Sequence, residues 1–177
     1  MTEHINEMMS NDDAVFNGQC VKVGDIVTFG KYRQTTSKPD PLQWRVLEID
    51  SANRKLLLLT EYVIDAKIFD RSHYGNYPTW AESDIRKWLN DTGTSGFLRE
   101  DYFTVSEQAL IVEVTNSTSN FKTFDDKFFA GGVDTQDKVF LLDRRDAMNT
   151  AYFADKEARK AKATLFIINN RTCKKTA

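Results

Sequence analysis

The residue types that build metal and redox sites are scarce in this 177-residue chain. It has two cysteines, Cys20 and Cys173, near opposite ends, and two histidines, His4 and His73. Their positions match neither the CxxC nor the HExxH spacing of a zinc site, and two distant thiols do not make a disulfide scaffold. We therefore expect no metal site built on histidine or cysteine, and a reducing compartment that leaves both thiols free.

Long apolar runs and an export signal are also missing. The four leucines at 56–59 are far fewer than the about 20 apolar residues that cross a bilayer. The first residues, MTEHINEMMSNDDAVF, lack the basic start and apolar stretch of a signal peptide. We expect a cytoplasmic protein without a membrane segment, and an extracellular or cell-surface location stays open.

The chain also lacks the short motifs of common enzyme sites. GxxxxGK[ST], GxGxxG and GxSxG do not occur in it. Ser72 and His73 are adjacent, and because neighbouring side chains rarely aim at each other, a loop histidine is the simpler interpretation. We expect no catalytic residues.

Charge is nearly balanced overall but uneven along the chain. The net charge of −2 argues against nucleic-acid binding by the chain as a whole. Residues 144–177 carry nine basic and three acidic side chains, a net charge of +6. A solvated helix face with a charged terminus explains this composition more simply than a polyanion site does. Nucleic-acid binding through this segment stays an alternative function.

Hydrophobic patterning predicts an α+β fold with a mixed or antiparallel sheet and a few short helices. Residues 21–29, 42–47, 55–60, 110–115 and 139–142 have the pattern of strands, the second and third forming a hairpin with a four- or five-residue connection. Capping boxes at 79–82 (TWAE) and 104–107 (TVSE) begin two helices, and Asp143 and Asp155 cap two more. Strands and helices do not alternate regularly, which argues against a doubly wound parallel sheet.

Two consequences for organisation follow from this pattern. We expect residues 1–20 to be a flexible leader and residues 21–177 to form a single α+β domain. The apolar positions of the expected elements predict the buried core: Trp44, Val46, Leu58, Ile85, Trp88, Leu89, Val139 and Leu141.

The irregular stretch 116–137 and the loop 72–77 are where we expect a ligand site, since long loops on a compact scaffold often carry function. Tyr74, Tyr77, Phe121 and Phe124 offer stacking area there, and Asp134 offers a carboxylate. The alternative is that these aromatic residues only pin the loops to the body of the domain.

Calcium is the one cofactor that this stretch suggests. Asp125, Asp126, Asp134 and Asp137 supply the oxygen ligands that calcium prefers, but the DxDxDG pattern of an EF-hand is absent. We expect no cofactor, with calcium as a minor alternative.

An ordered series of segments runs along the chain: GDIVTFGKY at 24–32, WRVL at 44–47, LLLT at 57–60, TW at 79–80, IRKWLN at 85–90, DKVFLL at 137–142 and ARKAKAT at 158–164. As a whole, the series resembles a bacterial family, the domain of unknown function 6273. The resemblance implies a C-type-lectin-like fold, as in formylglycine-generating enzymes and phage receptor-binding proteins. It carries no catalytic residues, and family members usually continue beyond the point where this chain ends, which implies a fold incomplete at the C-terminus.

These observations lead to a non-enzymatic binding or interaction module with an unknown protein or glycan ligand. An oxidase of the formylglycine-generating type is an alternative, but that class needs a cysteine pair late in the fold, where only Cys173 lies. An incomplete sheet would also leave an unpaired edge, so we expect self-association, with residues 165–168 as an unpaired apolar segment.

Overall fold

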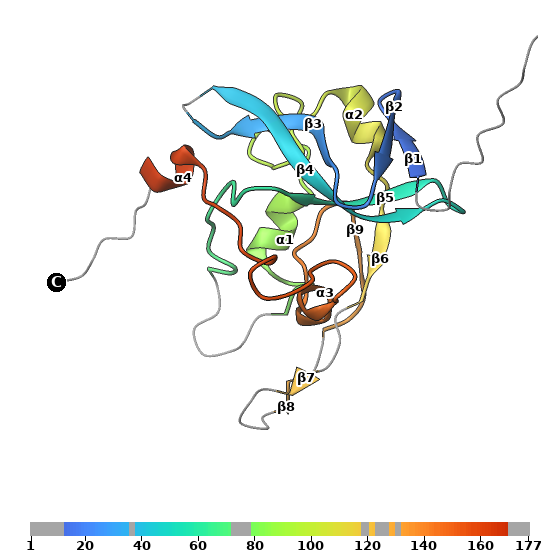
Figure 1. Ribbon diagram of the computed structural model, residues 1–177. Helices are drawn as coiled ribbons and strands as arrows, with labels where there is room; N and C mark the ends of the chain where they lie inside the picture. Colours follow the sequence, from blue (N-terminus) through green and yellow to red (C-terminus); the bar gives the residue numbers. More distant parts are fainter. Residues whose placement is uncertain are drawn as a thin grey trace, which may run out of the picture.

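The computed structural model describes residues 13–35, 38–71, 79–117, 121–122, 128–129 and 132–169. Small antiparallel sheets and short helices make up this part of the chain, which confirms the coarse α+β prediction (Figure 1). The helices are five or six residues long, and within the described ranges none is long and apolar enough to cross a membrane.

The first described element is a hairpin of β1 (Asp13–Phe16) and β2 (Gln19–Lys22). Its two-residue turn has positive φ at Asn17 (50°) and Gly18 (78°), as an Asn-Gly hairpin turn requires. Residues 13–20, which belong to the expected leader 1–20, form most of this hairpin around the Asn-Gly turn. Residues 1–12 lie outside the described part.

The main sheet has the strand order β3 (Ile26–Arg33), β4 (Pro39–Asp50), β5 (Lys55–Thr60), with both pairs antiparallel. The predicted hairpin is confirmed, and four residues connect β4 to β5. The predicted strand 21–29 is divided between β2 and β3, because the chain turns between them. Gly24, at φ 93°, makes that turn, and its N–H donates to the Val46 carbonyl at 2.8 Å.

Helix α1 (Asp84–Leu89) begins four residues later than the TWAE box predicts. The side chain of Ser83 is the N-cap and accepts from the Arg86 N–H at 3.2 Å. Helix α2 (Val105–Leu110) has the predicted capping box, with reciprocal hydrogen bonds between Thr104 and Glu107. Asp143 caps α3 (Arg144–Met148) as predicted.

The remaining predicted elements are only partly present. β6 (Val114–Asn116) pairs with β9 (Thr135–Asp137), and β7 (Phe121–Lys122) pairs with β8 (Phe128–Phe129). Residues 139–142 form no strand, and Asp155 caps only a turn. The apolar segment after it is the one-turn helix α4 (Leu165–Asn169), which has no buried residue.

The core lies between the β3–β4–β5 sheet, α1 and residues 97–103, while α1 and α3 lie below β5 in Figure 1. Trp44, Val46 and Leu89 are buried as predicted. Four further predicted residues are partly buried and pack against this core: Leu58, Ile85, Trp88 and Val139. The prediction for Leu141 is wrong, since its side chain is 45% exposed and the expected strand around it does not form.

Candidate ligand cavity

The predicted loop site falls largely outside the described residues. Tyr74, Tyr77 and Phe124 are not described, and of Phe121 only the backbone in β7 is. Asp134 is described and exposed just before β9. The loop site therefore stays a prediction.

Asp137, one of the four residues considered as candidate calcium ligands, is fully buried, and its carboxylate is surrounded by donors of the chain itself. Its carboxylate accepts from Trp80 Nε1 at 2.7 Å, from Arg86 Nε at 2.7 Å and, in β9 itself, from Thr135 Oγ1 at 2.6 Å. The Asn116 side chain adds a fourth contact at 3.2 Å. With these donors around it, Asp137 has an arginine where a cation would bind.

The electrostatics of this Asp137 cluster follow from those contacts. Burial alone would raise the pKa of Asp137, but the hydrogen bonds from Thr135, Trp80, Asn116 and Arg86 outweigh it and lower the pKa. Within the described residues, no group of three or more histidine, cysteine, aspartate and glutamate side chains could hold a metal ion. The contacts of the Asp137 cluster join α1 to β6 and β9.

Asn90, at the end of α1, holds the chain that leaves β9. Its Oδ1 accepts from the backbone N–H of Lys138 at 2.7 Å and of Val139 at 3.1 Å. Its Nδ2 donates to the Val139 carbonyl at 2.9 Å. The Asn90 side-chain amide thus makes the backbone hydrogen bonds that a neighbouring strand would make. These hydrogen bonds hold the start of residues 138–142, the segment that lies opposite β5.

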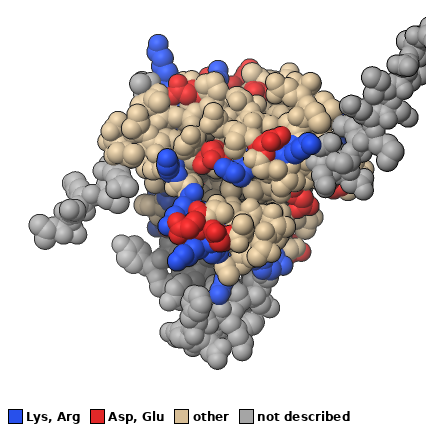
Figure 2. Space-filling model, viewed as in Figure 1, with Lys and Arg blue, Asp and Glu red and all other residues tan. Residues whose placement is uncertain are grey.

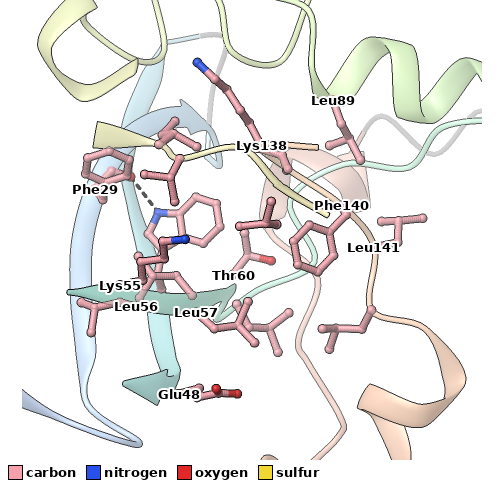
Figure 3. Close-up of a pocket in the computed structure, with 18 of the residues that line it drawn as sticks. Phe29, Glu48, Lys55, Leu56, Leu57, Thr60, Leu89, Lys138, Phe140 and Leu141 are labelled. Atoms are coloured by element: carbon pink, nitrogen blue, oxygen red, sulfur yellow. Dashed lines mark hydrogen bonds between the residues drawn. The ribbon is translucent and has the colours of Figure 1, made fainter. Parts of the chain in front are cut away.

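Between these residues and β5 lies a cavity of about 1220 Å³. Every residue of β5 lines it, together with residues 138–142, parts of α1 and the aromatic side chains of Trp44 and Trp88. In Figure 3, Phe140 points toward Thr60 of β5, with Leu57 below them, and Lys138 extends away from the leucines. Most of the lining is apolar, so the cavity suits an apolar ligand.

The carboxylates around the cavity are already engaged. Tyr32 donates to Asp65 at 2.6 Å, the Tyr152 hydroxyl donates to Glu48, and Asn53 donates to Asp50 at 2.7 Å. Burial, followed by these carboxylate contacts, raises the pKa of Tyr32 and raises that of Tyr152 to about 12. Both tyrosines therefore stay protonated at neutral pH and cannot act there as general bases.

Two lysines of the lining differ in their partners: Lys55 lies opposite Asp50 of β4 and interacts with its carboxylate, whereas Lys138 forms no ion pair among the described residues. Lys55 begins β5, and Lys138 is half-buried beside Asn90. On the face shown in Figure 2, Lys and Arg side chains elsewhere lie beside Asp and Glu side chains and do not form one basic patch.

The described part of the chain shows no cysteine pair that would support the oxidase alternative. Cys20 is exposed on β2, and Cys173 lies outside the described residues. The requirement for a cysteine pair therefore stays untested.

Small antiparallel sheets with short helices around an apolar cavity define an α+β domain, and a comparison with known families gives its relationship. The family model described as a domain of unknown function (DUF6273) matches residues 53–176, more than half of the chain, so the chain belongs to this family. The matched range begins in the β4–β5 turn, after the GDIVTFGKY and WRVL segments. Comparison with curated proteins and with solved structures finds no match.

Proposed function

We propose that this domain is a non-enzymatic binding module, and that its ligand site is the cavity between β5 and residues 138–142. The observation that carries the proposal is the cavity itself, which at about 1220 Å³ exceeds the about 300–1,000 Å³ typical of small-molecule pockets. Its walls are leucine, isoleucine, valine and aromatic side chains. An apolar surface of this extent commonly marks a binding site.

The ionisable groups around the cavity support binding over catalysis. Glu48, Asp50 and Asp65 are hydrogen-bonded within the chain, and the tyrosines that contact two of them stay protonated at neutral pH. Of the two ligand classes that the sequence suggests, protein and glycan, the apolar lining favours a protein segment. The family resemblance implies a C-type-lectin-like fold; that fold is part of this proposal and suits a binding role.

Titration with 1-anilinonaphthalene-8-sulfonate, which fluoresces in apolar sites, tests the proposal. We expect saturable binding at one site in the unmodified chain. Leu57→Arg and Phe140→Arg, on opposite walls, should each abolish it while a cooperative thermal transition is kept. Val105→Arg is the matched control, because Val105 is 66% exposed on α2 and does not line the cavity. Equal binding in all four proteins, or no binding in the unmodified chain, would contradict the proposal.

A further inference from the structure

The cavity reaches the β5 edge of the main sheet as well as one of its faces, where Phe29 of β3 and Trp44 of β4 line it. Successive side chains of a strand point to opposite faces, yet all six residues of β5 line the cavity. The strand order places β5 at the end of the sheet, paired with β4 on one side only in the described part of the chain. The free edge of β5 therefore opens into the cavity.

The hydrogen bonds of β4 show which backbone groups lie on that edge. Val46 pairs with Leu58 across the sheet, but its N–H donates to Asp25 at 2.9 Å and its carbonyl accepts from Gly24 at 2.8 Å. Since Val46 bonds on the β3 side, the N–H and carbonyl of Leu58 point away from β4.

Thr60 has the same orientation. The N–H of the next residue, Glu61, donates to the Gln43 carbonyl at 3.0 Å, and alternate residues of an antiparallel ladder face opposite sides. In the described chain neither Leu58 nor Thr60 has a backbone partner on the cavity side.

Unpaired backbone groups beside apolar side chains are costly unless a partner satisfies them. An acyl chain would fill the cavity and leave these groups unpaired. We infer that the ligand is an extended apolar segment of a partner protein, which adds a strand to β5; this inference rests on the proposed function.

The charged side chains that line the cavity indicate which residue types flank the bound segment. Five cationic side chains line the cavity: Arg54, Lys55, Lys67, Lys138 and Arg159. Three carboxylates also line it: Glu48, Asp50 and Asp65. Asp65 lies 3.6 Å from Lys67 and Asp50 interacts with Lys55, so the lining has an excess of two positive charges, five against three. An apolar strand flanked by acidic residues complements this surface.

A labelled nine-residue peptide of alternating valine and threonine with a glutamate at each end is the probe, read by fluorescence anisotropy. Two versions are N-methylated, one at the valine amides and one at the threonine amides. The alternation holds the register, so only one set of amides can face β5. We expect one methylated version to bind about tenfold or more weakly than the unmethylated peptide and the other to bind nearly as well. Equal effects of the two patterns would overturn the inference.

Leu58→Pro tests the same edge from the protein side. It removes a donor that faces away from β4, a position that tolerates proline, whereas Leu58→Ala shortens the same side chain and keeps the N–H. We expect Leu58→Pro to weaken the peptide about tenfold or more, Leu58→Ala to weaken it less, and neither to abolish binding of 1-anilinonaphthalene-8-sulfonate. If Leu58→Pro does not fold, the comparison of the two methylated peptides still tests the strand-addition inference.

The two probes separate this inference from the function on which it rests. Binding of 1-anilinonaphthalene-8-sulfonate without binding of the peptide would leave the apolar site in place and overturn the strand-addition inference. Failure of both probes would overturn both.

Discussion

Asp137 shows how far a single residue departs from the role that its sequence context suggests. Its place beside a loop with other aspartates suggested calcium, but Trp80, Arg86 and Thr135 donate to it in the folded chain. Trp80 and Arg86 are distant in sequence from Asp137, so no local pattern could reveal these contacts. The TWAE capping box placed Trp80 at the start of a helix, and nothing in that box pointed to Asp137.

Removing the Asp137 carboxylate should destabilise the domain strongly. Asp137→Ala leaves the Arg86 guanidinium, the Trp80 indole N–H and the Thr135 hydroxyl without their acceptor, and we expect a loss of about 3–5 kcal/mol in the free energy of unfolding. Asp134→Ala, an exposed aspartate three positions earlier, should change it by less than about 0.5 kcal/mol. Urea denaturation of both variants measures the difference, and similar losses would refute the role given to Asp137.

The same carboxylate predicts a dependence of stability on acid. The pKa of Asp137 is lower in the folded chain than its ordinary value of 3.8. The stabilisation is therefore fully present above pH 3.8 and is lost as the pH falls through the lower folded value. Urea denaturation at several acidic pH values should show a steeper fall for the unmodified chain than for Asp137→Asn, which cannot titrate. Identical slopes would show that other carboxylates carry the effect.

At the scale of elements, short sequence patterns predict a structure correctly where that structure depends only on residues close in sequence. The β4–β5 hairpin and the Thr104–Glu107 and Asp143 caps are present because each needs only neighbours in sequence. The TWAE box fails because Ser83, which is fully buried, caps α1 in its place. The apolar residues 139–142 do not become a strand because the Asn90 side chain takes the hydrogen bonds of residues 138 and 139.

Gly30, within β3, supplies a prediction at this scale. It has φ 64°, its N–H donates to Glu107 of α2 at 3.1 Å, and an added Cβ would lie 2.3 Å from the Phe103 ring. Gly30→Ala should therefore incur about 1–2 kcal/mol of backbone strain and about 1–3 kcal/mol of overpacking. Gly18→Ala, also at positive φ but with open space around it, should incur the strain alone. Thermal or urea denaturation measures both, and equal losses would contradict the close packing of Phe103 against β3.

At the scale of the whole molecule, the surface still predicts self-association. Leu165 and Ile168 of α4 are 56% and 48% exposed, and exposed apolar side chains favour contacts between molecules. We expect the sedimentation coefficient to rise with protein concentration, and Leu165→Gln with Ile168→Gln to reduce that rise. A concentration-independent monomer in the unmodified chain would contradict this expectation.

The candidate cavity could not be predicted from the sequence, although the strand that forms one wall was. The LLLL run indicates a strand, but the opposite wall comes from residues 138–142, which are placed by Asn90 and the Asp137 cluster. A void between segments so far apart in sequence depends on tertiary packing that local patterns do not encode. The sequence therefore favoured a ligand site in the loops, because aromatic residues in irregular segments are recognisable from the sequence and a cavity is not.

The most direct test of the central claim is to map where an apolar probe contacts the domain. Amide chemical shifts of the ¹⁵N-labelled chain, titrated with 1-anilinonaphthalene-8-sulfonate, report this residue by residue. The cavity account predicts that the largest changes cluster at residues 55–60 and 138–142, the two walls opposite each other. Changes centred on residues 72–77 and 116–134, or scattered over the surface, would contradict it.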